Sequence, residues 1–130
     1  MSGLLAAAGR VLLSIIFVVG GIGKLMAPGA TMGYIAAGGL PVPFLALIVA
    51  IVIELGGGLA LLVGYQTRLV AFGLAVWTMI TALIFHHDLG DHAQLIQFQK
   101  NLAITGGMLY VAAAGAMGPC VDYWRGRKAK

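Results

Sequence analysis

The sequence predicts an all-α integral membrane protein, in which four transmembrane helices pack as one bundle. Of its 130 residues, 61% are hydrophobic and only 9% are charged, whereas soluble domains are about 45 to 50% apolar and about 25% charged. So few charges cannot cover a water-exposed surface, but lipid tolerates an apolar exterior. Four apolar stretches of near-bilayer length complete the evidence, and lipid requires such stretches to be helical because their backbone polar groups must pair internally.

The predicted spans cover residues 10–25, 43–63, 69–85 and 101–117. About 20 helical residues cross a hydrocarbon core about 30 Å thick, and about 17 is the lower limit. The third and fourth spans therefore fit only when they stand nearly upright. We expect a single transmembrane domain over residues 1–130, and we expect the first helix to be retained because its apolar stretch lacks the basic start of a signal peptide.

The two longer connections are predicted on one side of the membrane. In the first, residues 31–37 lie between Pro28-Gly29 and Gly38-Gly39-Leu40-Pro41, which predicts a short interfacial helix with Gly/Pro stops. The second runs over residues 86–100 and is polar. The tight turn at residues 65–68 lies on the opposite side.

Basic residues predict the orientation. Lys24 and Lys100 lie on the side of the long connections, and the others lie on the side of the termini: Arg10, Arg68, Arg125, Arg127, Lys128 and Lys130. The positive-inside rule then places both termini in the cytoplasm of a bacterial-type inner membrane. Because the basic tail serves as an anchor to anionic headgroups, the partner we expect is the lipid bilayer and not nucleic acid.

Glu54 is the first candidate for chemistry, because it lies near the middle of the second span. An ionised carboxylate at that depth costs roughly 3 kcal/mol, so it should face the bundle interior and be protonated, paired or hydrated. We predict a catalytic, proton-exchanging role for Glu54. The alternative is a structural hydrogen bond between helices.

Trp77 and Tyr110 also lie near mid-membrane, where their N–H and O–H groups need acceptors. Glu54 could accept from both, with Thr78, Thr81 or Thr105 nearby. Ordinary aromatic packing is the alternative interpretation.

Polar groups gather at the ends of the spans opposite the termini. Lys24 closes a helix C-terminus, where a cation is favoured. Lys100 precedes a helix N-terminus, so its charge needs a carboxylate or a ligand carbonyl; the alternative is that it extends to the headgroups. His86, at a helix end, is a predicted pocket residue. The run that contains His87 matches no zinc signature, so we expect no metal.

The residue types argue against haem and nucleotide cofactors. Ligation of haem by two histidines inside the bundle needs imidazoles on two spans, and the first, second and fourth spans have none. Cys120 is the only cysteine, and no stretch is long enough for a dinucleotide fold. We therefore expect neither haem nor a nucleotide, and any redox ligand should be lipid-soluble.

Several motifs together resemble the DoxX family of small four-helix membrane proteins. They are Arg10, Gly23-Lys24, Gly39-Leu40-Pro41, Glu54-Leu55-Gly56-Gly57-Gly58, Leu62-Val63-Gly64 with Arg68, His86, Phe98-Gln99-Lys100-Asn101-Leu102-Ala103 and Gly106-Gly107. The resemblance covers nearly the whole chain, although residues 118–122 depart from the Ser-containing ending of the family. It implies a bacterial inner-membrane protein, and some relatives are subunits or partners of oxidoreductases that exchange electrons with quinones.

Three hypotheses follow. In the first, the protein is a membrane subunit that holds a quinone between its helices and receives electrons from an oxidoreductase partner. Glu54 handles the proton, and the quinone-binding candidates are Lys24, Trp77, His86, Lys100, Asn101 and Tyr110. In the second, the protein is a proton-coupled carrier of a small solute, which would require a homo-oligomer because four short spans make a narrow pathway. In the third, it is a structural or assembly subunit without catalysis.

Overall fold

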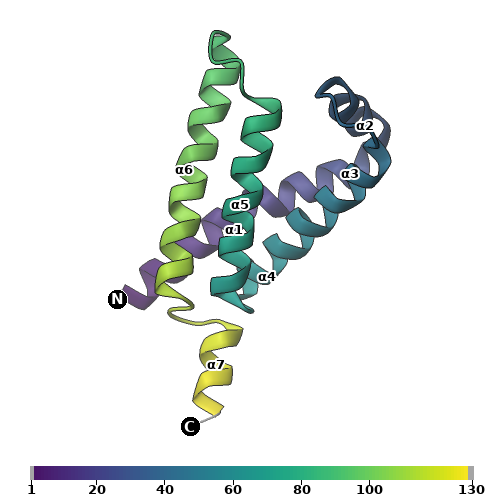
Figure 1. Cartoon of the computed structure of the whole chain (residues 1–130). Coiled ribbons are helices and arrows are strands. Elements are labelled where there is room, and N and C mark those ends of the chain that lie inside the picture. Colours follow the sequence, from purple (N-terminus) through teal and green to yellow (C-terminus); the bar gives the residue numbers. More distant parts are fainter. Residues whose placement is uncertain (1, 129–130) are drawn as a thin grey trace.

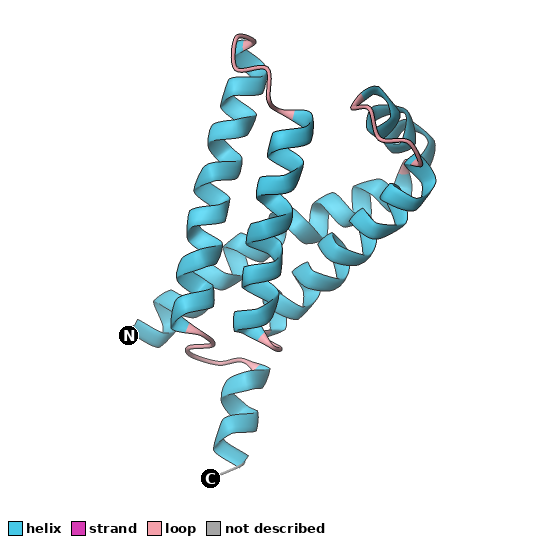
Figure 2. Ribbon diagram, viewed as in Figure 1, coloured by secondary structure: helices cyan, strands magenta, loops and turns pink. Residues whose placement is uncertain are grey.

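The computed structural model describes residues 2–128, with the side chains of residues 2–126. Lys130 of the basic tail lies outside these residues, as do the side chains of Arg127 and Lys128. The described chain is mostly helical, with short connections, and the described residues form no strand (Figure 2). Its elements are α1 (Ser2–Met26), α2 (Pro28–Ala37), α3 (Pro43–Ile51), the π-helical turn η1 (Val52–Gly56), α4 (Gly57–Val63), α5 (Thr67–Phe85), α6 (His92–Ala114) and α7 (Val121–Lys128).

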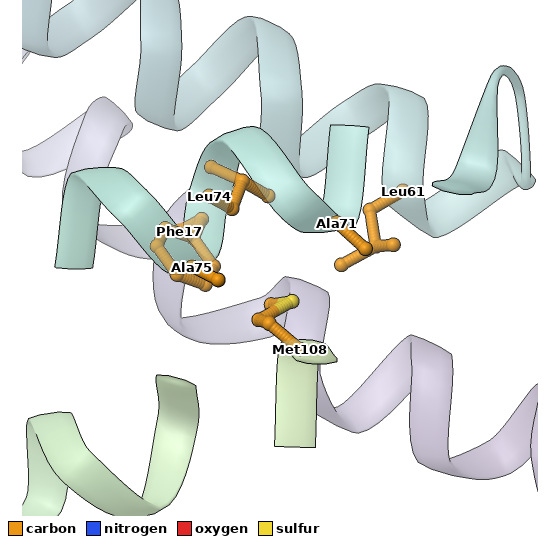
Figure 3. Close-up of a cluster of buried hydrophobic side chains, with 6 residues drawn as sticks. All are labelled: Phe17, Leu61, Ala71, Leu74, Ala75 and Met108. Atoms are coloured by element: carbon orange, nitrogen blue, oxygen red, sulfur yellow. The ribbon is translucent and has the colours of Figure 1, made fainter. Parts of the chain in front are cut away.

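The helices form two antiparallel pairs that cross each other (Figure 1). One pair is α1 with the continuous helix made by α3, η1 and α4, and the other is α5 with α6. A buried apolar cluster joins the pairs, with Phe17 from α1, Leu61 from α4, Leu74 from α5 and Met108 from α6 in contact (Figure 3). This cluster fixes how the two pairs lie against each other.

Two glycines let α1 approach its partner helix very closely. A Cβ at Gly21 would lie 2.7 Å from Leu55 Cβ and 2.9 Å from the Leu55 backbone nitrogen. A Cβ at Gly58 would lie 3.0 Å from the Val18 backbone nitrogen. Neither position has room for a larger residue, so these glycines determine the distance between α1 and the helix that carries Glu54.

The helix ends differ from the predicted spans in ways that local chemistry explains. α2 begins at Pro28, which suits the first turn of a helix because proline has no N–H to leave unpaired. α6 begins at His92, earlier than the predicted start at Asn101, because the Asp91 side chain caps it by accepting from the Ala93 N–H at 3.1 Å. It ends at Ala114, before the predicted end at Met117, because Gly115 has φ +75°.

Three helices of the described chain are long and apolar enough to cross a membrane: Ser2–Met26, Pro43–Val63 and Thr67–Phe85. Their outer faces expose large apolar side chains such as Leu12, Leu69 and Leu83, as expected where lipid is the solvent. α6 is as long, but its first half carries several glutamines and Lys100, which lower its hydropathy. It lies along α5 for most of its length (Figure 1).

Arg10 and Arg68, which the sequence analysis used as topology signals and as family motif residues, cap helices at the end of the bundle near α7. Arg10 is 4% exposed and donates hydrogen bonds to the carbonyls of Leu61 and Leu62, at the end of α4, and to Pro119 O at 3.0 Å. Arg68 donates to Ala114 O at the end of α6. Both cations therefore meet the negative ends of helix dipoles.

Asp122 fixes α7 to the start of α5. Its carboxylate accepts from the backbone N–H groups of Gln66 at 2.9 Å and Thr67 at 2.8 Å, which are free donors of a helix N-terminus. Burial raises the pKa of Asp122, but these hydrogen bonds and the positive charge of Arg125 outweigh it and hold the pKa below its usual value.

Candidate functional site

Glu54 lies inside the bundle, in the one turn of its helix that is π-helical. This turn is wider than an α-helical turn, and such single π-turns often occur at functional sites. The Glu54 side chain is 13% exposed. Gly20 on α1 makes room for it, because a Cβ at that position would lie 3.1 Å from Glu54 Oε2.

Two donors from different helices hold the carboxylate. Lys24 Nζ, from the last turn of α1, lies 2.7 Å from Oε2 and forms an ion pair with it. Trp77 Nε1, from α5, donates to Oε1 at 3.1 Å. The Lys24–Glu54–Trp77 cluster therefore ties together three helices, with one donor on each carboxylate oxygen.

A large groove opens on one side of this cluster. The α3–α5 groove has a volume of about 810 Å³, and its walls come from α1, α2, α3, α5 and the connection after α2. The rings of Tyr34 and Phe85 stack across it, with centroids 5.2 Å apart. Its apolar lining includes Ile35, Leu45, Val49, Ile80 and Ile84, and its polar lining includes Lys24, Thr31, Glu54, Trp77, Thr81 and His86.

A second, smaller cavity lies on the α6 side of the same cluster. The α6 cavity has a volume of about 200 Å³, and Asn101 and Ile104 are its α6 residues. Thr78 from α5 and Phe17 from α1 also line it. Five residues line both the groove and this cavity: Gly20, Lys24, Glu54, Trp77 and Thr81. The charged cluster is therefore the partition between two spaces.

Of the predicted site residues, the structure brings together Lys24, Glu54, Trp77, His86 and Asn101, and it separates Lys100 and Tyr110 from them. Lys100 is exposed and lines neither the groove nor the α6 cavity. The prediction that placed it beside Asn101 in a pocket was wrong, because successive residues of a helix point in directions roughly 100° apart. Asn101 faces inward and Lys100 faces out.

Tyr110 was also placed wrongly. Its side chain is 82% exposed, and it borders a third cavity, of about 290 Å³, beside Arg10 and not beside Glu54. Depth in the membrane does not determine the rotation of a helix, and Tyr110 is not on the face of α6 that carries Asn101 and Met108. Thr105 lies near that face, but it lines neither the groove nor the α6 cavity.

The pairing of Lys24 with Glu54 is the feature that sequence reasoning missed. Lys24 was assigned to the helix dipole and to the end of the bundle, and Glu54 to mid-membrane. A usable signal existed, because a buried carboxylate needs a partner and Lys24 is the only basic residue between Arg10 and Arg68. The long lysine side chain and the tilt of α1 bring the Lys24 ammonium to the depth of the Glu54 carboxylate.

Comparison with known proteins agrees with the motifs noted in the sequence. The DoxX family model matches residues 5–87, which include α1, η1 with Glu54 and α5 with Trp77. No solved structure matches the chain.

Two proteins of Escherichia coli (strain K12) are similar over most of their length. Inner membrane protein YqjF is 38% identical over 113 residues, covering 87% of this chain and 85% of that protein. Inner membrane protein YphA is 35% identical over 111 residues, covering 82% of this chain and 79% of that protein. This chain belongs to the DoxX family and is an inner membrane protein.

Proposed function

We propose that this protein binds a lipid-soluble molecule of the quinone class in the α3–α5 groove, as a membrane subunit that works with an oxidoreductase partner. The observation that supports this most directly is the position of the Lys24–Glu54–Trp77 cluster at the wall of a groove that is otherwise mainly apolar. A ring with carbonyl groups and an apolar tail has the same distribution of polarity.

The groove fits such a ligand in size and chemistry. Small-molecule sites have volumes of about 300 to 1,000 Å³ and combine apolar walls with a few convergent polar groups. The volume of about 810 Å³ lies in that range. Lys24 has three N–H donors and uses one of them on Glu54, so it can also donate to a ligand carbonyl. His86 offers a further ring nitrogen to the groove.

The roles that we assign to the residues follow from this arrangement. A quinone, when bound, supplies carbonyl acceptors and takes up protons together with electrons. Lys24 and His86 would orient a carbonyl by hydrogen bonding, and Glu54 would hold or release a proton beside it. The electrons are assigned to the partner protein.

We also propose that both termini face the cytoplasm. Arg10, Arg68 and α7 lie at the same end of the bundle, because Arg10 and Asp122 both bind the segment from Leu61 to Thr67 and Arg68 binds the end of α6. Lys24 lies toward the other end of α1. This distribution supports the orientation that the positive-inside rule predicts.

A structural role is the second candidate. The ion pair and Gly20, Gly21 and Gly58 all lie at the contact between α1 and the Glu54 helix. In that case the cluster would only hold two helices together for the assembly of another protein, and the groove would bind nothing.

Fluorescence of Trp77 separates the two candidates. The chain has two tryptophans, so Trp124→Phe leaves Trp77 as the reporter in the groove. We expect saturable quenching when this variant, in lipid nanodiscs, is titrated with a short-chain benzoquinone. Glu54→Gln and Lys24→Ala should weaken the apparent affinity.

A matched pair of variants controls for quinone that merely dissolves in lipid. Ala46 lines the groove, whereas Ala103 is exposed on α6. Ala46→Phe should abolish the saturable component, and Ala103→Phe should leave it intact. Linear quenching that is equal in both variants would remove the quinone proposal and leave the structural role.

A further inference from the structure

Polar groups that face the α6 cavity have more hydrogen-bonding capacity than the described residues satisfy. The Glu54 carboxylate has about four acceptor positions and receives two hydrogen bonds, from Lys24 and Trp77. The Lys24 ammonium donates one hydrogen bond, to Glu54, and has two further N–H groups. The Asn101 side chain makes no hydrogen bond to any residue between 2 and 128.

The α6 cavity is large enough to hold water molecules that could supply the missing hydrogen bonds. Its volume of about 200 Å³ is several times the roughly 30 Å³ that one water molecule occupies in the liquid. A buried water needs two to four polar partners, and the walls supply them from four helices, through Lys24, Glu54, Thr78, Thr81 and Asn101. An ion pair away from bulk water is also stabilised when its remaining hydrogen-bonding positions are filled.

We propose that the α6 cavity holds a cluster of water molecules, and that this cluster is the route by which Glu54 exchanges protons. In the exchange, Glu54 takes a proton from a hydronium ion and leaves a water molecule, or the reverse. Lys24 and Glu54 are the titratable residues that line the cavity. Asn101, on the opposite wall, would fix the water by both donating and accepting.

Water and ligand would therefore reach the carboxylate from opposite sides. Thr78, Asn101 and Ile104 line the α6 cavity and not the groove, whereas Ala46, Val49 and Ile84 line the groove and not the cavity. This division extends the proposed function, because it keeps an apolar ligand and the proton supply in separate compartments. The α6 cavity also gives Asn101 a role different from contact with a quinone carbonyl.

Water-edited solid-state NMR of the protein in lipid bilayers, without added quinone, tests the proposal. Magnetisation transfer from water should reach the Thr78 side chain and the Asn101 side-chain amide several-fold faster than it reaches Leu74 and Met108 in the dry core. Thr78 is 4% exposed and lines the α6 cavity, so fast transfer there would report water in that cavity. Transfer as slow as that to Leu74 would overturn the proposal.

Two variants test the route. Asn101→Leu places an apolar side chain in the cavity, and it should slow hydrogen–deuterium exchange of the Trp77 indole N–H several-fold and reduce water transfer to Thr78. Gln97→Leu, one turn earlier on α6, changes an exposed residue that does not line the cavity, and it should change neither. A thermal unfolding transition like that of the wild type would show that Asn101→Leu is folded. If exchange of the Trp77 indole N–H is then unchanged in this variant, the route is refuted.

The tests of the water cluster and the quinone titration can succeed or fail independently. Saturable quenching of Trp77 with a dry α6 cavity would overturn the water cluster and leave the ligand proposal standing. A hydrated α6 cavity without saturable quenching of Trp77 would overturn the ligand proposal and leave the water cluster standing.

Discussion

Lys24 Nζ lies 2.7 Å from Glu54 Oε2, and this ion pair joins the last turn of α1 to the π-helical turn in the middle of the second span. The two side chains are 27% and 13% exposed, so both charges are largely withdrawn from the surroundings. The pair is the structural solution to a carboxylate at membrane depth. It also places a carboxylate and a cation side by side at the wall of a groove.

Removing one partner of this pair should cost more than removing both. Lys24→Met leaves the carboxylate without its cation, and Glu54→Gln leaves the ammonium without its anion, so each should lower stability by about 3 kcal/mol. The double variant should recover part of the loss. Thermal unfolding in detergent measures this, and losses that simply add would show that the two charges do not stabilise each other.

Gly21→Ala should separate α1 from the Glu54 helix. The new Cβ would lie 2.7 Å from Leu55 Cβ and 2.9 Å from its backbone nitrogen, and backbone cannot move aside as a flexible side chain does. We expect a loss of at least about 2 kcal/mol, of the size that overpacking causes. Binding at the groove should weaken with it.

Gly23→Ala is the matched control on the same helix. Nothing lies within 4 Å of a Cβ at that position, and alanine favours a helix over glycine by about 1 kcal/mol. The variant should therefore be neutral or slightly more stable. Equal destabilisation by both alanines would show that the close contact with Leu55 does not determine the effect.

Arg10→Lys should destabilise the end of the bundle near α7. The guanidinium donates to carbonyls in two separate segments, which a single ammonium cannot reproduce with the same geometry. At about 1 kcal/mol for each hydrogen bond, we expect a loss of about 2 kcal/mol. Arg125→Lys, at an exposed arginine that stacks on Tyr65, should cost less than 1 kcal/mol.

Asp122 predicts a dependence of stability on pH. Its pKa is lowered on folding from an ordinary value of 3.8, so the ionised form is favoured in the folded state. Its contribution is therefore fully present above about pH 4 and is lost as the pH falls through the lowered pKa. The difference in melting temperature between the wild type and Asp122→Asn should be clear at pH 6 and should shrink near pH 3. A difference that does not change with pH would argue against this contribution.

Composition and the length of the apolar stretches determined that this chain is a helical membrane protein, because 9% charge cannot solvate a surface and lipid leaves the backbone few alternatives to a helix. Sequence also identified Glu54, since a carboxylate in an apolar span is costly without a partner. Trp77 was named as a possible donor to it because an indole N–H at mid-membrane needs an acceptor.

Only the tertiary structure decided which groups meet. Lys24 reaches Glu54 because Gly20 and Gly21 let α1 pack closely on the π-helical turn. Asn101 faces a cavity while Lys100, its neighbour, faces outward. Rotation and tilt of a helix are determined by packing against other helices. Depth counted along the sequence fixes neither, which is why Tyr110 was expected beside Glu54 and lies beside Arg10 instead.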